Sequence, residues 1–169
     1  MGDLFAAVQA GDEKAVRELL EARPELAGER NAEGLSPVLV ALYNGKSELV
    51  DPILDANPPL DVFEAAAVGR TRGLEELLEA APGLAQAWSA DGFTPLHLAA
   101  FFGQEDAARL LLDRGADPRV VSTHQQIQVA PVQSAAAGGH DAIVRLLLER
   151  GAELADLEDE LRARYTDEA

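Results

Sequence analysis

Histidines with a serine nearby are the side chains of this chain that come nearest to a catalytic pattern. Ser122 lies shortly before His124 in the sequence, and Ser134 lies shortly before His140. A serine hydroxyl beside an imidazole could act as a nucleophile activated by a general base. Such a pair is defined by three-dimensional geometry, which proximity in the sequence does not supply. We therefore predict no catalytic residue and interpret His124 and His140 as solvated polar side chains.

Metal and phosphate chemistry have equally little support in the sequence. Neither His124 nor His140 has a second histidine, or a trio of acidic residues, at a metal-ligand spacing such as i and i+4. The Gly138-Gly139 pair lies between two expected helices, whereas a phosphate-cradling glycine loop follows a strand. The chain contains no cysteine, so disulfides and thiolate chemistry are excluded. We expect neither a metal nor a cofactor.

The elements around these residues follow a motif that is most complete between Asp91 and Asp117. It reads Asp91-Gly92-Phe93-Thr94-Pro95-Leu96-His97-Leu98-Ala99-Ala100, followed by Gly103, Leu110-Leu111-Leu112 and Gly115-Ala116-Asp117. Gly92 suits a turn with positive φ, Pro95 suits the first turn of a helix, and paired alanines let two helices approach closely. This segment resembles one complete ankyrin repeat. The resemblance implies a helix-turn-helix unit that must stack on neighbouring units to bury its apolar face.

Earlier segments repeat this motif more loosely. An offset of 58 residues (61 minus 3) aligns Asp3–Pro59 with Asp61–Asp117 without a gap, and on the order of a third of the positions are identical. Glycines between paired helices recur at Gly11, Gly45, Gly69, Gly103 and Gly139. We predict an all-α repeat solenoid of stacked helix-turn-helix ankyrin repeats with short β-hairpin fingers. Residues 1–169 would form a single domain with about five helix pairs.

Three segments depart from the regular repeat. Asn57-Pro58-Pro59-Leu60 replaces a finger with a stiff extended link. Residues 118–129 exceed the usual finger and combine β-branched flanks with a polar tip, which favours a longer hairpin. Beyond Gly151, apolar side chains recur at helical spacing among acidic residues, at Leu154, Leu157, Leu161 and Tyr165. We predict that residues 153–165 form a C-terminal capping helix.

The resemblance also implies where a partner protein would bind. In ankyrin repeats the contacts come from finger residues near the turn glycine and from the residues that end the first helix. Carried over to this sequence, these positions hold Trp88, Asp91, Phe93, Phe101 and Phe102 in the fourth repeat, and Arg30, Glu33, Leu35 and Tyr43 in the second. To these we add His124, Gln125 and Gln126, at the tip of the long finger.

These candidate residues carry different expectations about burial. Trp88 and Phe93 are expected to be exposed, because aromatic side chains are common anchors of protein interfaces. Phe101 and Phe102 could instead pack between neighbouring repeats, and for them both arrangements remain open. His97 resembles the family histidine whose ring ties neighbouring fingers together through hydrogen bonds.

The charge of the chain narrows the class of partner. Thirty acidic residues against fourteen basic ones give a formal net charge of −16. Such a surface repels nucleic-acid phosphates and anionic lipid headgroups, and it attracts basic proteins. The N-terminal residues include no apolar run typical of a signal peptide. We therefore expect a cytoplasmic, monomeric, non-catalytic module that binds a protein partner with a basic face through its concave surface of fingers and helices.

Two alternatives stay open. One is a ligand-binding or enzymatic role for the long finger at residues 118–129 and its histidine, and the other is an inert or self-associating scaffold. A buried titratable group beside a ligand-sized pocket would favour the first alternative. A contiguous patch of exposed aromatic side chains would argue against an inert scaffold.

Overall fold

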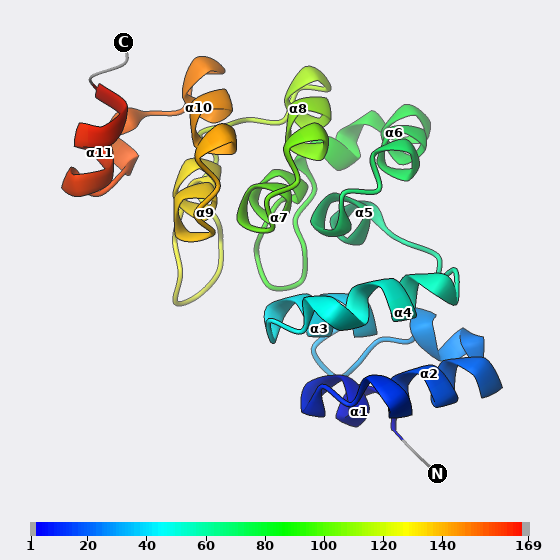
Figure 1. The fold of residues 1–169 in the computed structure, drawn as a ribbon. Coiled ribbons are helices and arrows are strands. Elements are labelled where there is room, and N and C mark those ends of the chain that lie inside the picture. Colours follow the sequence, from blue (N-terminus) through cyan, green and yellow to red (C-terminus); the bar gives the residue numbers. More distant parts are fainter. Residues whose placement is uncertain (1–2, 167–169) are drawn as a thin grey trace. The chain divides into compact units, whose positions relative to one another are not determined.

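The computed structural model describes residues 3–166, and every regular element in that range is a helix (Figure 1). The chain divides after Leu60 into two compact units, which we call the first unit and the second unit. Residues 1–2 and 167–169, which the predicted single domain of residues 1–169 includes, lie outside the described range. Within that range, no helix has both the length and the apolar character needed to cross a membrane.

The first unit contains two helix pairs. Its elements are α1 (Leu4–Ala10), α2 (Glu13–Ala22), the 3₁₀ helix η1 (Pro24–Gly28), α3 (Pro37–Tyr43), the 3₁₀ helix η2 (Ser47–Leu49) and α4 (Val50–Asp55). Helix α1 packs on α2 and α3, and α4 packs on α2 and α3. Val8, Val16, Leu49 and Ile53 are fully buried and form the centre of this unit. Hydrophobic burial between the two pairs therefore holds the first unit together.

The second unit contains three further helix pairs and a terminal segment. Its elements are α5 (Val62–Val68), α6 (Thr71–Ala80), the 3₁₀ helix η3 (Pro82–Gln86), α7 (Pro95–Phe101), α8 (Glu105–Asp113), α9 (Pro131–Ala137), α10 (Asp141–Glu149), the 3₁₀ helix η4 (Leu154–Asp156) and α11 (Asp159–Thr166). The first helices stack in the order α5, α7, α9, and the second helices stack in the order α6, α8, α10. This is a helical repeat array.

Small residues and caps explain why the pairs stack so closely. Ala99 and Ala100 of α7 are fully buried, and so is Ala135 of α9, so the helix backbones can approach one another. Helix α7 begins at Pro95, whose fixed φ suits the first turn, behind the N-cap residue Thr94. The predicted helix start at Pro95 is confirmed.

Polar side chains near the inter-helix glycines also tie successive pairs together. The Gln104 amide donates to the Ala67 carbonyl oxygen at 3.1 Å, and His140 Nε2 donates to the Phe101 carbonyl oxygen at 3.0 Å. A Cβ at Gly103 would lie 2.5 Å from the His140 ring, so only glycine admits this contact. His140 is therefore a half-buried structural residue, and its interpretation as a solvated side chain is wrong.

The fingers are turns, and the expected β-hairpins are not seen among residues 3–166. The Ser89 N–H donates to the Phe93 carbonyl oxygen at 2.8 Å, and the Gly92 N–H donates to the Ser89 carbonyl oxygen at 3.0 Å. In return, the Phe93 N–H donates to the Ser89 hydroxyl oxygen at 3.0 Å. Because a side chain takes the position of the second backbone partner, no strand ladder forms.

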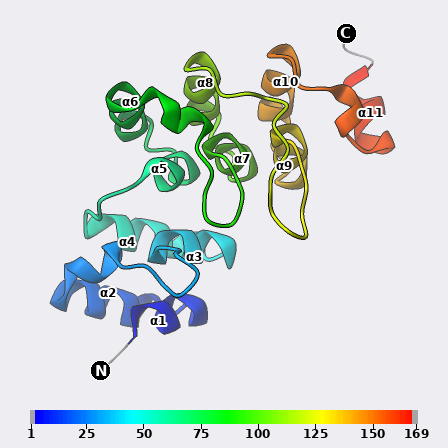
Figure 2. The same ribbon diagram turned by 180° about the vertical axis from the view of Figure 1, so that it is seen from behind.

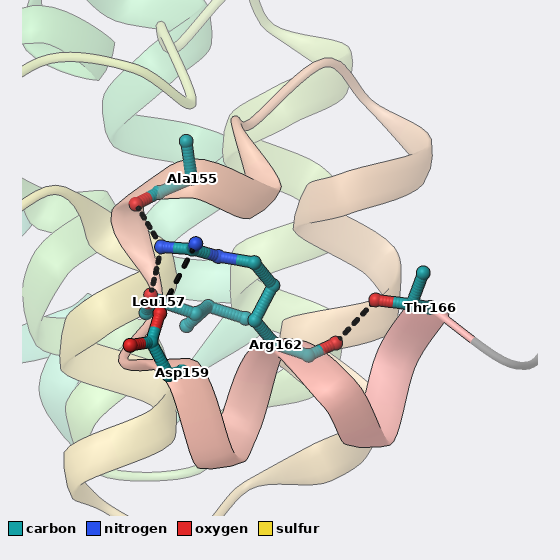
Figure 3. Close-up of polar contacts among 5 residues, drawn as sticks. All are labelled: Ala155, Leu157, Asp159, Arg162 and Thr166. Carbon is teal, nitrogen blue, oxygen red and sulfur yellow. Dashed lines mark hydrogen bonds and ion pairs between the residues drawn. The ribbon is translucent and has the colours of Figure 1, made fainter.

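The C-terminal segment differs from the continuous helix expected over residues 153–165. The chain is extended at Leu157, which separates η4 from α11. Arg162 spans this break: its guanidinium donates to the carbonyl oxygens of Ala155 (3.1 Å) and Leu157 (3.0 Å) and pairs with Asp159 at 3.2 Å (Figure 3). A side chain that binds backbone oxygens replaces the hydrogen bonds that a continuous helix would have made.

The terminal segment is held on α10 by polar and cation–π contacts. Of its expected apolar stripe, Leu157 and Tyr165 are buried, whereas Leu154 and Leu161 are half-buried. The Tyr165 hydroxyl donates to Asp141 at 2.7 Å, and Arg145 lies 5.4 Å from the centre of the Tyr165 ring. Burial beside the Asp141 carboxylate raises the pKa of Tyr165. That this segment caps the array remains a prediction.

Candidate protein-binding surface

Two loops of the second unit lie against each other and carry most of the candidate residues. We call residues 88–93 the finger loop and residues 118–129 the long loop. Both project in the same direction from their helix pairs, before α7 and before α9 (Figures 1 and 2). The Thr123 N–H donates to the Gly92 carbonyl oxygen at 2.9 Å. A Cβ at Gly92 would lie 2.6 Å from the His124 backbone nitrogen, so this glycine makes the close approach possible.

His97 fastens the long loop to the base of the finger loop. The Thr94 N–H lies 3.2 Å from Nδ1, so we assign the ring proton to Nε2, which donates to the Val129 carbonyl oxygen at 2.8 Å. The side chain is fully buried, and this burial lowers the pKa of His97. The predicted structural role of His97 is confirmed.

His124 is also a structural residue, contrary to its interpretation as a solvated side chain. Its Nδ1 accepts the N–H groups of Gln126 (3.2 Å) and Ile127 (3.1 Å), and its ring stacks on Phe93 with centroids 5.4 Å apart. Phe93 was expected to be exposed, but it is half-buried because it lies against both His124 and His97. Phe93 therefore packs beneath the surface, and less of its ring is available to a partner than expected.

Ser122 closes the long loop from within. Its hydroxyl donates to the Ile127 carbonyl oxygen at 2.7 Å and accepts the Val129 N–H at 3.0 Å, while the Ser122 N–H donates to the Val129 carbonyl oxygen at 2.8 Å. With its proton committed to a carbonyl and the His124 Nδ1 committed to two amides, Ser122 and His124 form no nucleophile–base pair. No group of three or more metal-ligating side chains occurs among residues 3–166.

Large apolar side chains are exposed on these loops and at the end of α7. Trp88 is 43% exposed, as expected, and Phe101 is 42% exposed. Phe102 is half-buried and packs edge to face on Phe101, with ring centroids 5.1 Å apart. Val121 and Ile127 of the long loop are about half exposed and were missed by the sequence reasoning. Their β-branched side chains give no sequence signal of exposure, because they lie outside the helical periods that separate a buried face from an exposed one.

Two hollows flank the finger loop. The larger, which we call the fingertip cleft, has a volume of about 420 Å³ and is lined by Ser89, Ala90, Asp91, Gly92, Thr123, His124, Gln125 and Gln126. The smaller, which we call the tryptophan pocket, has a volume of about 100 Å³ and is lined by Ala85, Gln86, Trp88, Thr94, Asp117 and Val120. The structure thus brings Asp91, Gln125 and Gln126 together at one cleft and places Trp88 at the other hollow.

The remaining candidate residues belong to the first unit. Arg30 and Glu33 are exposed at the turn before α3, Leu35 is half-buried, and Tyr43 is 38% exposed at the end of α3. This turn is closed by Asn31, whose side-chain oxygen accepts the N–H groups of Glu33 (3.1 Å) and Leu35 (2.8 Å).

Several known proteins are similar to this chain in sequence. The chain is 33% identical over 131 residues to the E3 ubiquitin-protein ligase KEG of Arabidopsis thaliana, which covers 70% of this chain and 8% of that protein. It is 28% identical over 135 residues to the human DNA-binding protein RFXANK, covering 61% of this chain and 52% of that protein. It is 43% identical over 67 residues to the probable E3 ubiquitin-protein ligase XBOS31 of rice (Oryza sativa subsp. japonica), covering 39% of this chain and 15% of that protein.

These similarities cover part of each relative: the chain spans about half the length of RFXANK and a much smaller part of the two ligases. Residues 4–122 and 62–159 match the protein family described as "Ankyrin repeats (3 copies)". The stacked helix pairs, the glycine turns and the histidine tie between fingers agree with this match. The chain belongs to the ankyrin-repeat family.

Proposed function

We propose that this chain is a non-catalytic protein-interaction module whose second unit holds a protein partner through the finger loop, the long loop and Phe101. Ankyrin repeats generally mediate protein–protein interaction. The observation that supports this surface is the exposure of Trp88 on a loop that is bonded at its tip to the neighbouring loop. Tryptophan is among the residues that contribute most to binding energy when a partner covers them.

Pre-organisation of the two loops supports the proposal. The bonds from Thr123 to Gly92 and from His97 to Val129 hold the loops in place before a partner arrives. A surface that is already ordered loses less conformational entropy on binding than a mobile loop does. An exposed aromatic side chain on such a support can therefore act as an anchor.

Charge supports a partner with a basic face. The formal net charge of −16 attracts positively charged surfaces over a distance of about a Debye length, and added salt weakens the attraction. Asp91 at the fingertip cleft and Asp117 at the tryptophan pocket place carboxylates beside the proposed contact residues. We propose that the acidic surface speeds the encounter and that the aromatic side chains slow dissociation.

The names of the relatives describe whole proteins, of which the matched repeats are a part. The matched segments make up 8% and 15% of two proteins named as ubiquitin ligases, so the ligase activity is not carried over to this chain. We propose only that the repeats here, like ankyrin repeats generally, bind a partner.

The ligand-binding alternative has one observation in its favour, the fingertip cleft. Its volume of about 420 Å³ is within the range of small-molecule sites, but polar groups line it and Ser122 and His124 are occupied by backbone partners. The inert-scaffold alternative does not explain why Trp88 and Phe101 are exposed. Protein binding therefore accounts for more of this surface.

A photo-crosslinking experiment tests the proposal. A benzophenone amino acid would replace Ala90, exposed on the finger loop beside Trp88, in one variant and Lys14, exposed on α2, in a control. A partner crosslinked from position 90 and not from position 14 would then be purified, and its affinity measured for the native chain and for Trp88→Ala. We expect at least about a tenfold loss for Trp88→Ala, as for an interface anchor. Equal affinities for the two chains would refute the proposed surface.

A further inference from the structure

The tryptophan pocket has a composition that suggests what it binds. Trp88 and Asp117 line the same hollow, with Val120, Thr94 and Gln86. Its volume of about 100 Å³ is well below the roughly 300–1,000 Å³ of small-molecule sites. A hollow of this size accommodates the end of one side chain and not a metabolite.

Contacts within the second unit hold the walls of this pocket. The Arg119 N–H donates to Asp117 Oδ1 at 2.9 Å, which orients the carboxylate. The Gln86 amide nitrogen donates to the Gly115 carbonyl oxygen at 3.1 Å, which fixes a second lining residue. The side chain of Arg119 extends toward Glu153, with Nη1 4.0 Å from Oε1.

An indole and a carboxylate together favour one chemical group. The face of an indole ring attracts cations, and a carboxylate pairs with a planar guanidinium through two parallel hydrogen bonds. A lysine ammonium can satisfy the charge, but it is compact and strongly hydrated and does not stack on an aromatic ring as a guanidinium does. The formal net charge of −16 adds a general attraction for such a cation.

We propose that the tryptophan pocket takes an arginine side chain of the protein partner, stacked on Trp88 and paired with Asp117. This inference rests on the proposed function and names the chemistry at one point of that surface. The fingertip cleft, with Gln125 and Gln126, is lined by the same finger loop and would contact the flanking backbone of the same partner segment.

Trp88 is the only tryptophan of the chain, so its fluorescence reports on this pocket directly. The test titrates the full chain with three blocked tripeptides, acetyl-Gly-Xaa-Gly-amide, in which Xaa is arginine, lysine or the neutral isostere citrulline. We expect a saturable change with the arginine peptide, at least about fivefold weaker binding of the lysine peptide, and no saturable change with the citrulline peptide. Equal binding of arginine and citrulline peptides would overturn the inference.

Two variants with the same change in net charge separate the pocket from general electrostatics. Asp117→Asn keeps an oxygen that accepts the Arg119 N–H but removes the charge, and Asp106→Asn removes an exposed charge in the first turn of α8, outside the pocket. We expect Asp117→Asn to weaken the arginine peptide at least about fivefold and Asp106→Asn by less than about twofold. Backbone amide shifts of Val120, measured by NMR, give a second readout. Equal effects of the two variants would overturn the inference.

The purified partner distinguishes this inference from the proposed function. If its binding depends on Trp88 but not on Asp117, the arginine pocket is wrong and the protein-binding surface stands. If its binding is indifferent to both residues, the proposed surface fails and the inference fails with it. Loss of binding in both variants supports both.

Discussion

The turn before α3 in the first unit and the turn before α7 in the second unit have the same hydrogen-bond pattern. They differ in what packs on them. A backbone bond closes each, from Asn31 to Leu35 at 2.9 Å and from Ser89 to Phe93 at 2.8 Å. In each, the side chain of the first residue also accepts the N–H of the last. The turn glycine, however, is exposed at Gly34 and buried at Gly92, where the long loop covers it.

The third residue of each following helix reflects the same difference. Helix α7 has His97 at this place, which bonds to Val129 of the long loop. Helix α3 has a buried leucine at this position, Leu39. Helix α9 has Gln133, whose side-chain oxygen accepts the N–H of Ala130, three residues earlier, at 2.7 Å. A buried imidazole needs a hydrogen-bond partner. Of these three helices, α7 has the imidazole, and the long loop supplies its partner. Similar local turns therefore acquire different buried side chains according to what packs on them.

The largest effect is expected at the turn glycines. Gly92→Ala should lower the free energy of unfolding by about 3 kcal/mol or more, because φ is +87° and the added Cβ would meet the His124 backbone at 2.6 Å. Gly34→Ala, with φ of +80° on an exposed turn, should cost only the backbone strain of about 1–2 kcal/mol. Urea unfolding followed by far-UV circular dichroism and by Trp88 fluorescence measures both. Equal costs would mean that the loops do not pack tightly in solution.

Exchange of the third helical residues should have the next largest effect. His97→Leu, which copies α3, should cost about 1–3 kcal/mol because the ties to Thr94 and Val129 are lost. The reverse change, Leu39→His, should also destabilise, because it places an imidazole at a position where the leucine is buried. The same unfolding assays apply. A stable Leu39→His variant would show that the histidine does not require a following loop.

A smaller effect is expected from pH. Because folding lowers the pKa of His97, the unfolded chain takes up the proton near pH 6.5 before the folded chain does. This residue's contribution to stability should therefore be complete above about pH 6.5 and fall by up to about 1.4 kcal/mol per pH unit as the pH drops to the lowered pKa, below which it levels off. Unfolding free energies between pH 7.5 and 5 should show this slope in the native chain. His97→Leu should reduce it, and an unchanged slope would assign it to other groups.

The smallest effect on stability is expected at the exposed tryptophan. Trp88→Ala should change the free energy of unfolding by less than about 1 kcal/mol, because the side chain is 43% exposed. Phe93→Ala should cost more, since the Phe93 ring packs against His97 and His124. Thermal unfolding by circular dichroism compares the two variants. A larger loss at Trp88 than at Phe93 would show that Trp88 supports the fold and is not held ready for a partner.

Local patterns in the sequence were sufficient for the helices and their pairing. Pro95 marks the start of α7 and Gly103 its separation from α8, because helix starts and left-handed turns depend on residues close in sequence. The exposure of Trp88 and the tie made by His97 also followed from the place of these residues in the repeat. These properties are determined by the sequence itself, since each follows from the position of a residue within its repeat.

Only the tertiary structure decided how the irregular segments lie. Phe93 is half-buried because His124, from the next loop, stacks on it, and Ser122 closes that loop through backbone groups that no local pattern identifies. Likewise, Arg162 bridges a break at Leu157 that the helical spacing of the leucines conceals. The pocket shared by Trp88 and Asp117 arises in the same way. In each case the contact depends on how the chain folds back on itself. The periodicity of residues along the chain carries no information about such contacts.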